Sequence, residues 1–169
     1  KKSGNSIIAI IVVHTFGNAA QLDELVTLCK DRNITLIEDA AESIGTFYKF
    51  GKLKGKHTGT IGKLGCLSFN GNKIITCGSG GMILTDNKKL AIKAKYLTTQ
   101  AKNNSIYYIH NEVGYNFRLN NIQAAFGLAQ LERLPYFIKQ KKRIREYYKN
   151  AIKSIKGLSI ALVPDYAEN

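Results

Sequence analysis

Five polar residues in three separate stretches of the sequence could take part in one chemical reaction. They are Asp39 in "EDAAES", Ser68 and Lys73 in "SFNGNK", and Asn116 and Arg118 in "GYNFRLN". Pyridoxal phosphate needs an amine for a Schiff base, a carboxylate beside its pyridine nitrogen, and hydroxyl or N–H donors around its phosphate. A guanidinium can bind the carboxylate of an amino-acid substrate. Together the five residues offer every part of such a site, whereas Lys73 alone would be interpreted as a surface lysine.

Alternating strands and helices are expected to position these residues. The β-branched run at 7–13 predicts a parallel strand covered on both faces, and "ITLIED" at 34–39 predicts a second strand. Between them a helix is expected over 19–32, with Asn18 as its N-cap. In such a βαβ unit, ligands bind beyond the carboxyl ends of the strands, which is where Asp39 is expected.

The rest of the chain continues this α/β pattern. Further strands are expected at 66–70, 81–86 and 158–164, and helices at 88–98, 121–133 and from Pro135 to about 155. The segments 47–65 and 101–120 are expected to be loops. The pattern predicts an α/β domain with a mostly parallel sheet, followed by the beginning of a second subdomain.

The composition limits the class of protein and its partners. The chain has 169 residues, 44% of them hydrophobic, and a formal net charge of +13. This size predicts one domain or a large part of one, and the charge favours anionic ligands such as phosphorylated compounds. The basic run "KQKKRIR" at 139–145 is interpreted as the solvated face of a helix, because an apolar stripe at helical spacing follows it.

The cysteines and the apolar runs indicate a protein of the cytoplasm. Cys29, Cys66 and Cys77 form no CxxC pair and have no metal-ligand spacing, so reduced thiols and no metal site are expected. The longest apolar run, at 7–13, is too short to cross a bilayer, and no signal peptide is visible. We therefore expect no membrane partner.

Three stretches resemble the DegT/DnrJ/StrS family of pyridoxal-phosphate-dependent sugar aminotransferases. They are "IEDAAESIG", "GCLSFNGNKIITCGSGGMILTD" and "EVGYNFRLNNIQAAFGLAQLERL". The resemblance implies the core of a fold-type I PLP-dependent transferase large domain, with three layers and a mostly parallel sheet. Residues 1–134 would belong to this large domain, and 135–169 to a connecting helix and the start of the small domain. "FYKFGKLKGKHTGT", "LTTQAK" and "HNEVGYN" further resemble the branch that makes 4-amino sugars for legionaminic-acid-type nonulosonates.

The resemblance assigns a role to each of the five residues. Lys73 matches the lysine that forms the Schiff base and moves the proton between substrate and cofactor. Asp39 matches the carboxylate that pairs with the pyridinium nitrogen, and Ser68 matches a hydroxyl that binds the phosphate. Asn116 matches an asparagine that reaches the cofactor of the partner subunit in a homodimer. Arg118 is expected to bind the donor carboxylate, to shape the dimer, or to form a structural ion pair.

Two departures from the family's pattern affect these expectations. Glu42 occupies a position near the cofactor's 3′-oxygen where many relatives have His or Gln, and a carboxylate there would repel a phenolate unless it is protonated or turned away. The family's N-terminal Gly-Thr/Ser segment and its C-terminal small domain have no match in this sequence. The resemblance therefore implies a fragment that would lack activity on its own.

Several functions remain open from the sequence. The leading one is transamination of a keto nucleotide-sugar, with a UDP-linked 4-keto-6-deoxyhexose as acceptor and glutamate as donor. Some relatives are PLP-dependent dehydratases, in which histidine replaces the lysine that forms the Schiff base. The presence of Lys73 therefore disfavours dehydration. A noncatalytic basic module that binds nucleic acid would need its basic and aromatic residues on one surface, and the run at 139–145 is the only candidate. An inactive family member is disfavoured by the presence of Asp39, Ser68 and Lys73 together.

Overall fold

A four-stranded sheet forms the centre of the computed structural model, which describes residues 6–104 and 106–169. Its strand order is β1-β2-β4-β5, in which β1, β2 and β4 run parallel and β5 is antiparallel to β4. The strands are β1 (Ala9–Val13), β2 (Thr35–Asp39), β4 (Leu64–Ser68) and β5 (Gly81–Leu84). The expected α/β architecture with a mostly parallel sheet is therefore confirmed.

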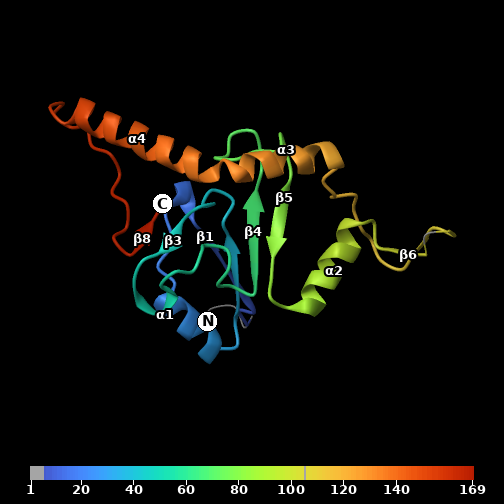
Figure 1. Cartoon of the computed structure of the whole chain (residues 1–169). Helices are drawn as coiled ribbons and strands as arrows, with labels where there is room; N and C mark the ends of the chain where they lie inside the picture. Colours follow the sequence, from blue (N-terminus) through green and yellow to red (C-terminus); the bar gives the residue numbers. More distant parts are fainter. Residues whose placement is uncertain (1–5, 105) are drawn as a thin grey trace.

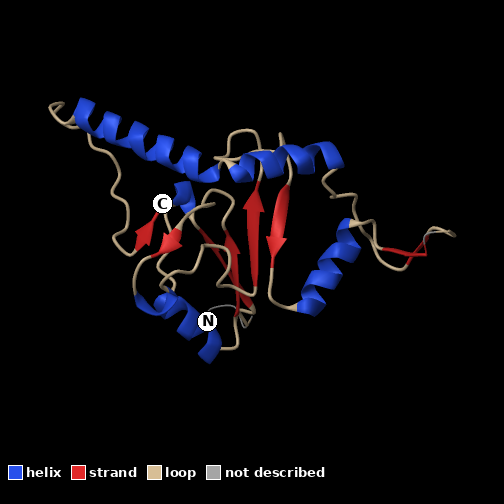
Figure 2. Cartoon of the chain, viewed as in Figure 1, coloured by secondary structure: helices blue, strands red, loops and turns tan. Residues whose placement is uncertain are grey.

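Helices and short strands surround this sheet (Figures 1 and 2). The α-helices are α1 (Asp23–Asp31), α2 (Lys88–Thr98), α3 (Asn121–Glu132) and α4 (Leu134–Ile152). Two short 3-10 helices lie at η1 (Thr15–Gly17) and η2 (Gly51–Leu53). Two-stranded pairs join β3 (Phe47–Tyr48) with β8 (Ala167–Glu168), and β6 (Lys102–Asn104) with β7 (Ile109–His110).

Helices α3 and α4 lie across the end of the sheet to which β4 points, which is the carboxyl edge of the parallel strands (Figure 1). Asn120 caps α3 with a reciprocal capping box to Gln123, and Pro135 begins α4. This end of the molecule is where an α/β sheet binds its ligands. Among the described residues, no helix is long and apolar enough to cross a membrane.

Three expectations about the elements are wrong. The strand β1 is covered on one face only, because Ile11 is 66% and Val13 51% exposed and no described helix lies over them. Helix α1 begins at Asp23, since Asn18 accepts a hydrogen bond from Asn169 instead of capping a helix. The segment 158–164 forms no strand, and β8 forms further along the chain because it can pair there with β3.

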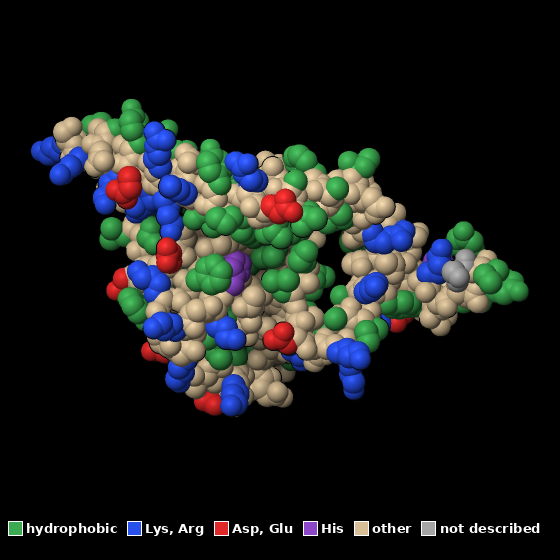
Figure 3. Space-filling view, viewed as in Figure 1, with side chains coloured by type: hydrophobic (Ala, Val, Ile, Leu, Met, Phe, Trp, Pro, Cys, Tyr) green, Lys and Arg blue, Asp and Glu red, His purple; other side chains and the backbone are tan. Residues whose placement is uncertain are grey.

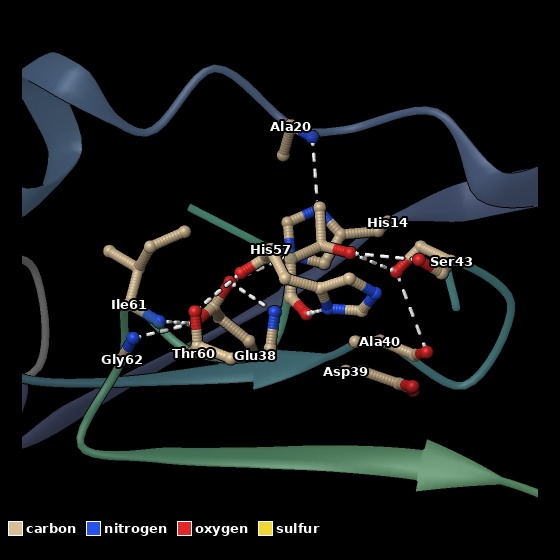
Figure 4. A network of polar contacts seen from close by, with 12 residues as sticks. His14, Ala20, Glu38, Asp39, Ala40, Ser43, His57, Thr60, Ile61 and Gly62 are labelled. Carbon is tan, nitrogen blue, oxygen red and sulfur yellow. Dashed lines mark hydrogen bonds and ion pairs between the residues drawn. The ribbon is translucent and has the colours of Figure 1, made fainter. Parts of the chain in front are cut away.

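A buried carboxylate connects the ends of β1 and β2 with the loop before β4 (Figure 4). Glu38 is fully buried and accepts four hydrogen bonds, from His14 Nε2 at 3.0 Å and from three backbone N–H groups of Gly59, Ile61 and Gly62 at 2.6–2.8 Å. His14 Nδ1 in turn accepts from the N–H of Ala20 at 3.0 Å. His14 therefore donates from Nε2 to Glu38 and has a structural role.

Hydrogen bonding keeps Glu38 ionised in spite of its burial. Burial alone would raise its pKa, but the bonds from His14 and from the N–H groups of Gly62, Gly59 and Ile61 lower the pKa below the ordinary value for glutamate. The carboxylate thus replaces lost water with protein donors, as a buried charge requires.

We expect Glu38→Gln to lower the free energy of unfolding by ~2–4 kcal/mol. The NH2 group of the glutamine would face N–H donors that now bond the carboxylate, and these buried donors would lose their acceptor. Urea denaturation at neutral pH measures the change. Glu132→Gln removes the same charge from an exposed position on α3 and should stay within ~0.5 kcal/mol of wild type. Equal stability of Glu38→Gln and wild type would show that the network does not stabilise the fold.

The stability difference between wild type and Glu38→Gln should depend on pH. The pKa of Glu38 is lower in the folded than in the unfolded state, so its contribution is complete above the ordinary glutamate pKa of about 4.3. It is lost as the pH falls below this value through the lowered pKa of the folded state. Urea midpoints measured between about pH 7 and pH 3 should therefore converge on acidification. A gap that widens at low pH would contradict the assignment.

Candidate active site

Lys73 lies in a tight loop between β4 and β5 that the chain holds by its own backbone. The N–H of Lys73 donates to Asn70 O at 3.1 Å, and Phe69 and Cys77 close the loop with a 3.0 Å backbone bond. Phe69, Ile75 and Cys77 form a small buried cluster against Leu134 and Phe137 of α4. The loop is therefore anchored on both sides of Lys73, whose own side chain is 16% exposed.

The amine of Lys73 contacts the carboxylate of Glu42. Nζ lies 3.3 Å from Oε1, while Oε2 accepts the backbone N–H of Phe16 at 2.7 Å. The Phe16 bond and then the Lys73 bond lower the pKa of Glu42, so this carboxylate is ionised at neutral pH. Glu42 is thus bonded to an amine and to a backbone amide of its own chain.

A cleft of about 530 Å³ opens in front of Lys73. Ser68 and Asn72 line it beside the lysine, and Phe16 and Glu42 line it from the segments that follow β1 and β2. Its remaining wall is formed by α4 and by the segment after it. The volume lies within the range of small-molecule sites, and its position at the carboxyl edge of the sheet is the one expected for α/β folds.

Asp39 lies at the last position of β2, as the sequence predicted. The register places it in one row with Val13 and Cys66, on the face of β1 that the described helices leave open. Burial and then the negative charge of Asp39 raise the pKa of the Cys66 thiol. Oδ1 of Asp39 accepts the N–H of Ala41 at 3.0 Å, and no described residue bonds Oδ2.

Asn116 and Arg118 lie away from this cleft. Asn116 forms a backbone bridge with Thr99 and accepts a weak 3.4 Å bond from Nε of Arg118. Arg118 lines a second hollow beside Ser79 and Gln123, and it forms no ion pair with the described residues. The structure therefore brings Ser68 and Lys73 together with Glu42 in one cleft, whose lining does not include Asp39 and does not include Asn116 or Arg118 of the same chain.

The glycines after Lys73 serve the chain itself. Gly80 has a φ of +97°, and a Cβ there would lie 2.6 Å from Leu119 Cδ2. This close approach is made to the segment before α3, and Gln123 of α3 also bonds Ser79 at 3.0 Å.

The sequence analysis missed three residues that line the cleft from α4. Lys141, Lys142 and Arg145 belong to the basic run that was interpreted as a solvated face, yet they form one wall of the cleft. Lysine and arginine spacing alone could not show this, because only the crossing of α4 over the sheet brings them there.

The residues present fit pyridoxal phosphate by their chemistry. Lys73 supplies an amine in a cleft, Ser68 a hydroxyl, and Asp39 a carboxylate whose Oδ2 is bonded by no described residue. The described residues contain no cluster of three or more His, Cys, Asp or Glu that could hold a metal ion. The donor set therefore suits an aldehyde with a phosphate and a basic ring nitrogen.

The parallel sheet and the lysine-bearing cleft at its carboxyl edge define a ligand-binding α/β domain. Residues 4–168 match the DegT/DnrJ/EryC1/StrS aminotransferase family, and the chain belongs to it. This confirms the family that the three sequence stretches resembled.

Known relatives agree with this assignment. The chain is 42% identical over 167 residues to the putative pyridoxal phosphate-dependent aminotransferase EpsN of Bacillus subtilis, covering 99% of this chain and 41% of EpsN. It is 41% identical over 155 residues to the GDP-perosamine synthase of Escherichia coli O157:H7, covering 92% of this chain and 41% of that protein. The crystal structure of the aminotransferase TlmJ from Streptoalloteichus hindustanus superposes with a TM-score of 0.86 at 27% identity, over 99% of this chain and 44% of TlmJ. The chain thus spans about 41% of the length of these two curated relatives.

Proposed function

We propose that the protein is a pyridoxal-phosphate-dependent aminotransferase that transfers an amino group to a keto nucleotide-sugar. The observation that carries the proposal is Lys73, whose amine is held by an anchored loop in a cleft at the carboxyl edge of the sheet. Family membership supports the same chemistry. A histidine in place of this lysine would have favoured dehydration.

Lys73, Ser68 and Glu42 of the cleft, and Asp39 at the end of β2, each have a proposed task. When bound, the cofactor would supply an electron sink for bonds at the substrate carbon. Lys73 would hold the cofactor covalently and then move a proton to and from that carbon with its free amine. Asp39 would keep the ring nitrogen protonated by its negative charge, and the hydroxyl of Ser68 would bind the phosphate. Glu42 would lie near the 3′-oxygen, restrained by the N–H of Phe16.

The finer substrate assignment rests on the resemblance to the nonulosonate branch. We propose a UDP-linked 4-keto-6-deoxyhexose as acceptor and glutamate as donor, in the synthesis of surface polysaccharide or nonulosonate sugars. The curated relative that makes GDP-perosamine has a guanosine nucleotide in its name, so UDP and GDP are the two nucleotides to compare. Arg118 is proposed to bind the donor carboxylate.

We propose a homodimer with shared active sites. The arm formed by β6 and β7 extends away from the sheet, and its apolar side chains are exposed (Figure 1). Ile106, Tyr107, Tyr108, Val113 and Phe117 are between 68% and 78% exposed. Such a patch is typical of an interface, and Asn116 lies within this region, far from the cleft of its own chain. Its proposed role is to reach the partner subunit's cofactor.

Two organisational proposals follow the same reasoning. Residues 1–134 are assigned to the large domain and 135–169 to the connecting helix and start of the small domain, with the division after the first residue of α4. The three cysteines are free thiols, which agrees with a protein of the cytoplasm.

We expect Lys73→Ala to abolish the visible absorbance that the wild-type protein acquires with pyridoxal phosphate, because Lys73 is the amine that the anchored loop holds beside Ser68. The spectrum of the intact protein with the cofactor, before and after glutamate, measures this. Lys54→Ala, which removes an exposed lysine outside the cleft, should retain both the band and its response. A band that persists in Lys73→Ala would end the proposal.

Mixing two inactive variants should restore activity if the sites are shared. In a Lys73→Ala and Asn116→Ala heterodimer, one site carries both changes and the other carries neither. An equal mixture that exchanges subunits should therefore recover about a quarter of wild-type activity. The glutamate-dependent loss of the cofactor's visible absorbance measures the recovery. No recovery, with heterodimers shown to form, would place Asn116 at the cofactor of its own chain or outside the site.

A further inference from the structure

We propose that Lys141, Lys142 and Arg145 of α4 bind the diphosphate of the nucleotide-sugar substrate. This inference rests on the proposed function and adds the residues that recognise the substrate's phosphates. All three residues line the same cleft as Lys73 and Ser68, on the wall that α4 forms. Figure 3 shows basic side chains gathered along α4.

The helical spacing separates these three residues from their basic neighbours. Lys141 and Arg145 are four residues apart and Lys142 and Arg145 three, so all three lie on one side of α4. Lys139 and Arg143 belong to the same basic run but do not line the cleft. The helix therefore presents one group of cations to the cleft and another to solvent.

The present partners of these cations would not prevent an anion from binding. Lys142 pairs with Glu168 at 2.8 Å and Arg145 with Glu146 at 3.2 Å. Both pairs are largely exposed, and exposed pairs of this kind contribute little. Lys141 forms no ion pair with the described residues, and the one carboxylate lining the cleft, Glu42, is already bonded to Lys73 and Phe16.

The diphosphate fits this wall better than the cofactor's phosphate does. The cofactor would be fixed by the amine of Lys73 and by Ser68, both of which belong to the β4–β5 side of the cleft. A nucleoside diphosphate carries two adjacent phosphates, so it gains most from several cations in a row, and arginine can bind a phosphate bidentately. Three cations within one helical turn provide such a row.

Calorimetric titration of the cofactor-loaded protein with UDP, and in parallel with GDP, tests the assignment. Lys141→Ala and Arg145→Ala should each weaken binding of the preferred nucleotide by roughly tenfold, through lost charge-assisted hydrogen bonds. Lys139→Ala and Arg143→Ala remove the same charges from the same helix and should change it less than about twofold. If the two cleft variants and the two control variants weaken nucleotide binding equally, α4 contributes only general charge attraction. This result would overturn the proposal.

A second measurement separates the two possible phosphates. Titration of each variant with pyridoxal phosphate should give an unchanged affinity and an unchanged visible band, because the cofactor is held on the other wall. A loss of cofactor affinity with nucleotide affinity intact would assign the cations to the cofactor instead. Absence of a Lys73-dependent band in the wild type would contradict the proposed function itself. Nucleotide binding that is unchanged by the α4 substitutions would contradict only the assignment of the diphosphate to α4.

Discussion

The buried carboxylate of Glu38 is the interaction on which the geometry of the carboxyl edge depends. Its four hydrogen bonds come from the end of β1 and from the loop that leads into β4. The next residue along the chain is Asp39, so the position of the proposed cofactor ligand follows from the position of its buried neighbour. One buried ionised group thus fixes two segments against β2, because each of the two supplies donors that it cannot lose without a large cost.

Local signals predicted much of the fold. The helix at 88–98 was expected with the bounds that the structure has, and the break at Pro135 separates α3 from α4. The errors occur where a distant partner decides the outcome. Asn18 bonds Asn169 and leaves α1 to begin later, and β8 forms where Phe47 can pair with Glu168 across more than a hundred residues. A local sequence pattern does not show such long-range pairings.

In the candidate site too, contacts between residues close in sequence were predicted, whereas contacts with a distant segment were not. Lys73 and Ser68 lie within one loop-and-strand segment, so their spacing already predicted that they would meet. The cations of α4 were interpreted as facing water, since their helix has an apolar stripe that explains its amphipathicity without a ligand. The structure corrects this because one helix can present two polar surfaces, and only its crossing over the sheet determines which of them meets the cleft. The same crossing disfavours a nucleic-acid-binding surface, which would need the whole basic run on one exposed face.

Glu42 is the carboxylate that contacts Lys73 in the cleft. Its carboxylate was expected to conflict with a phenolate, yet the structure gives it two donors that do not belong to any ligand. The bond from Phe16 comes from the backbone of η1, so it does not depend on the state of Lys73. Lys73 is the only cation among the groups that lower the pKa of Glu42, so the backbone bond restrains the position of the carboxylate whereas Lys73 supplies the opposite charge.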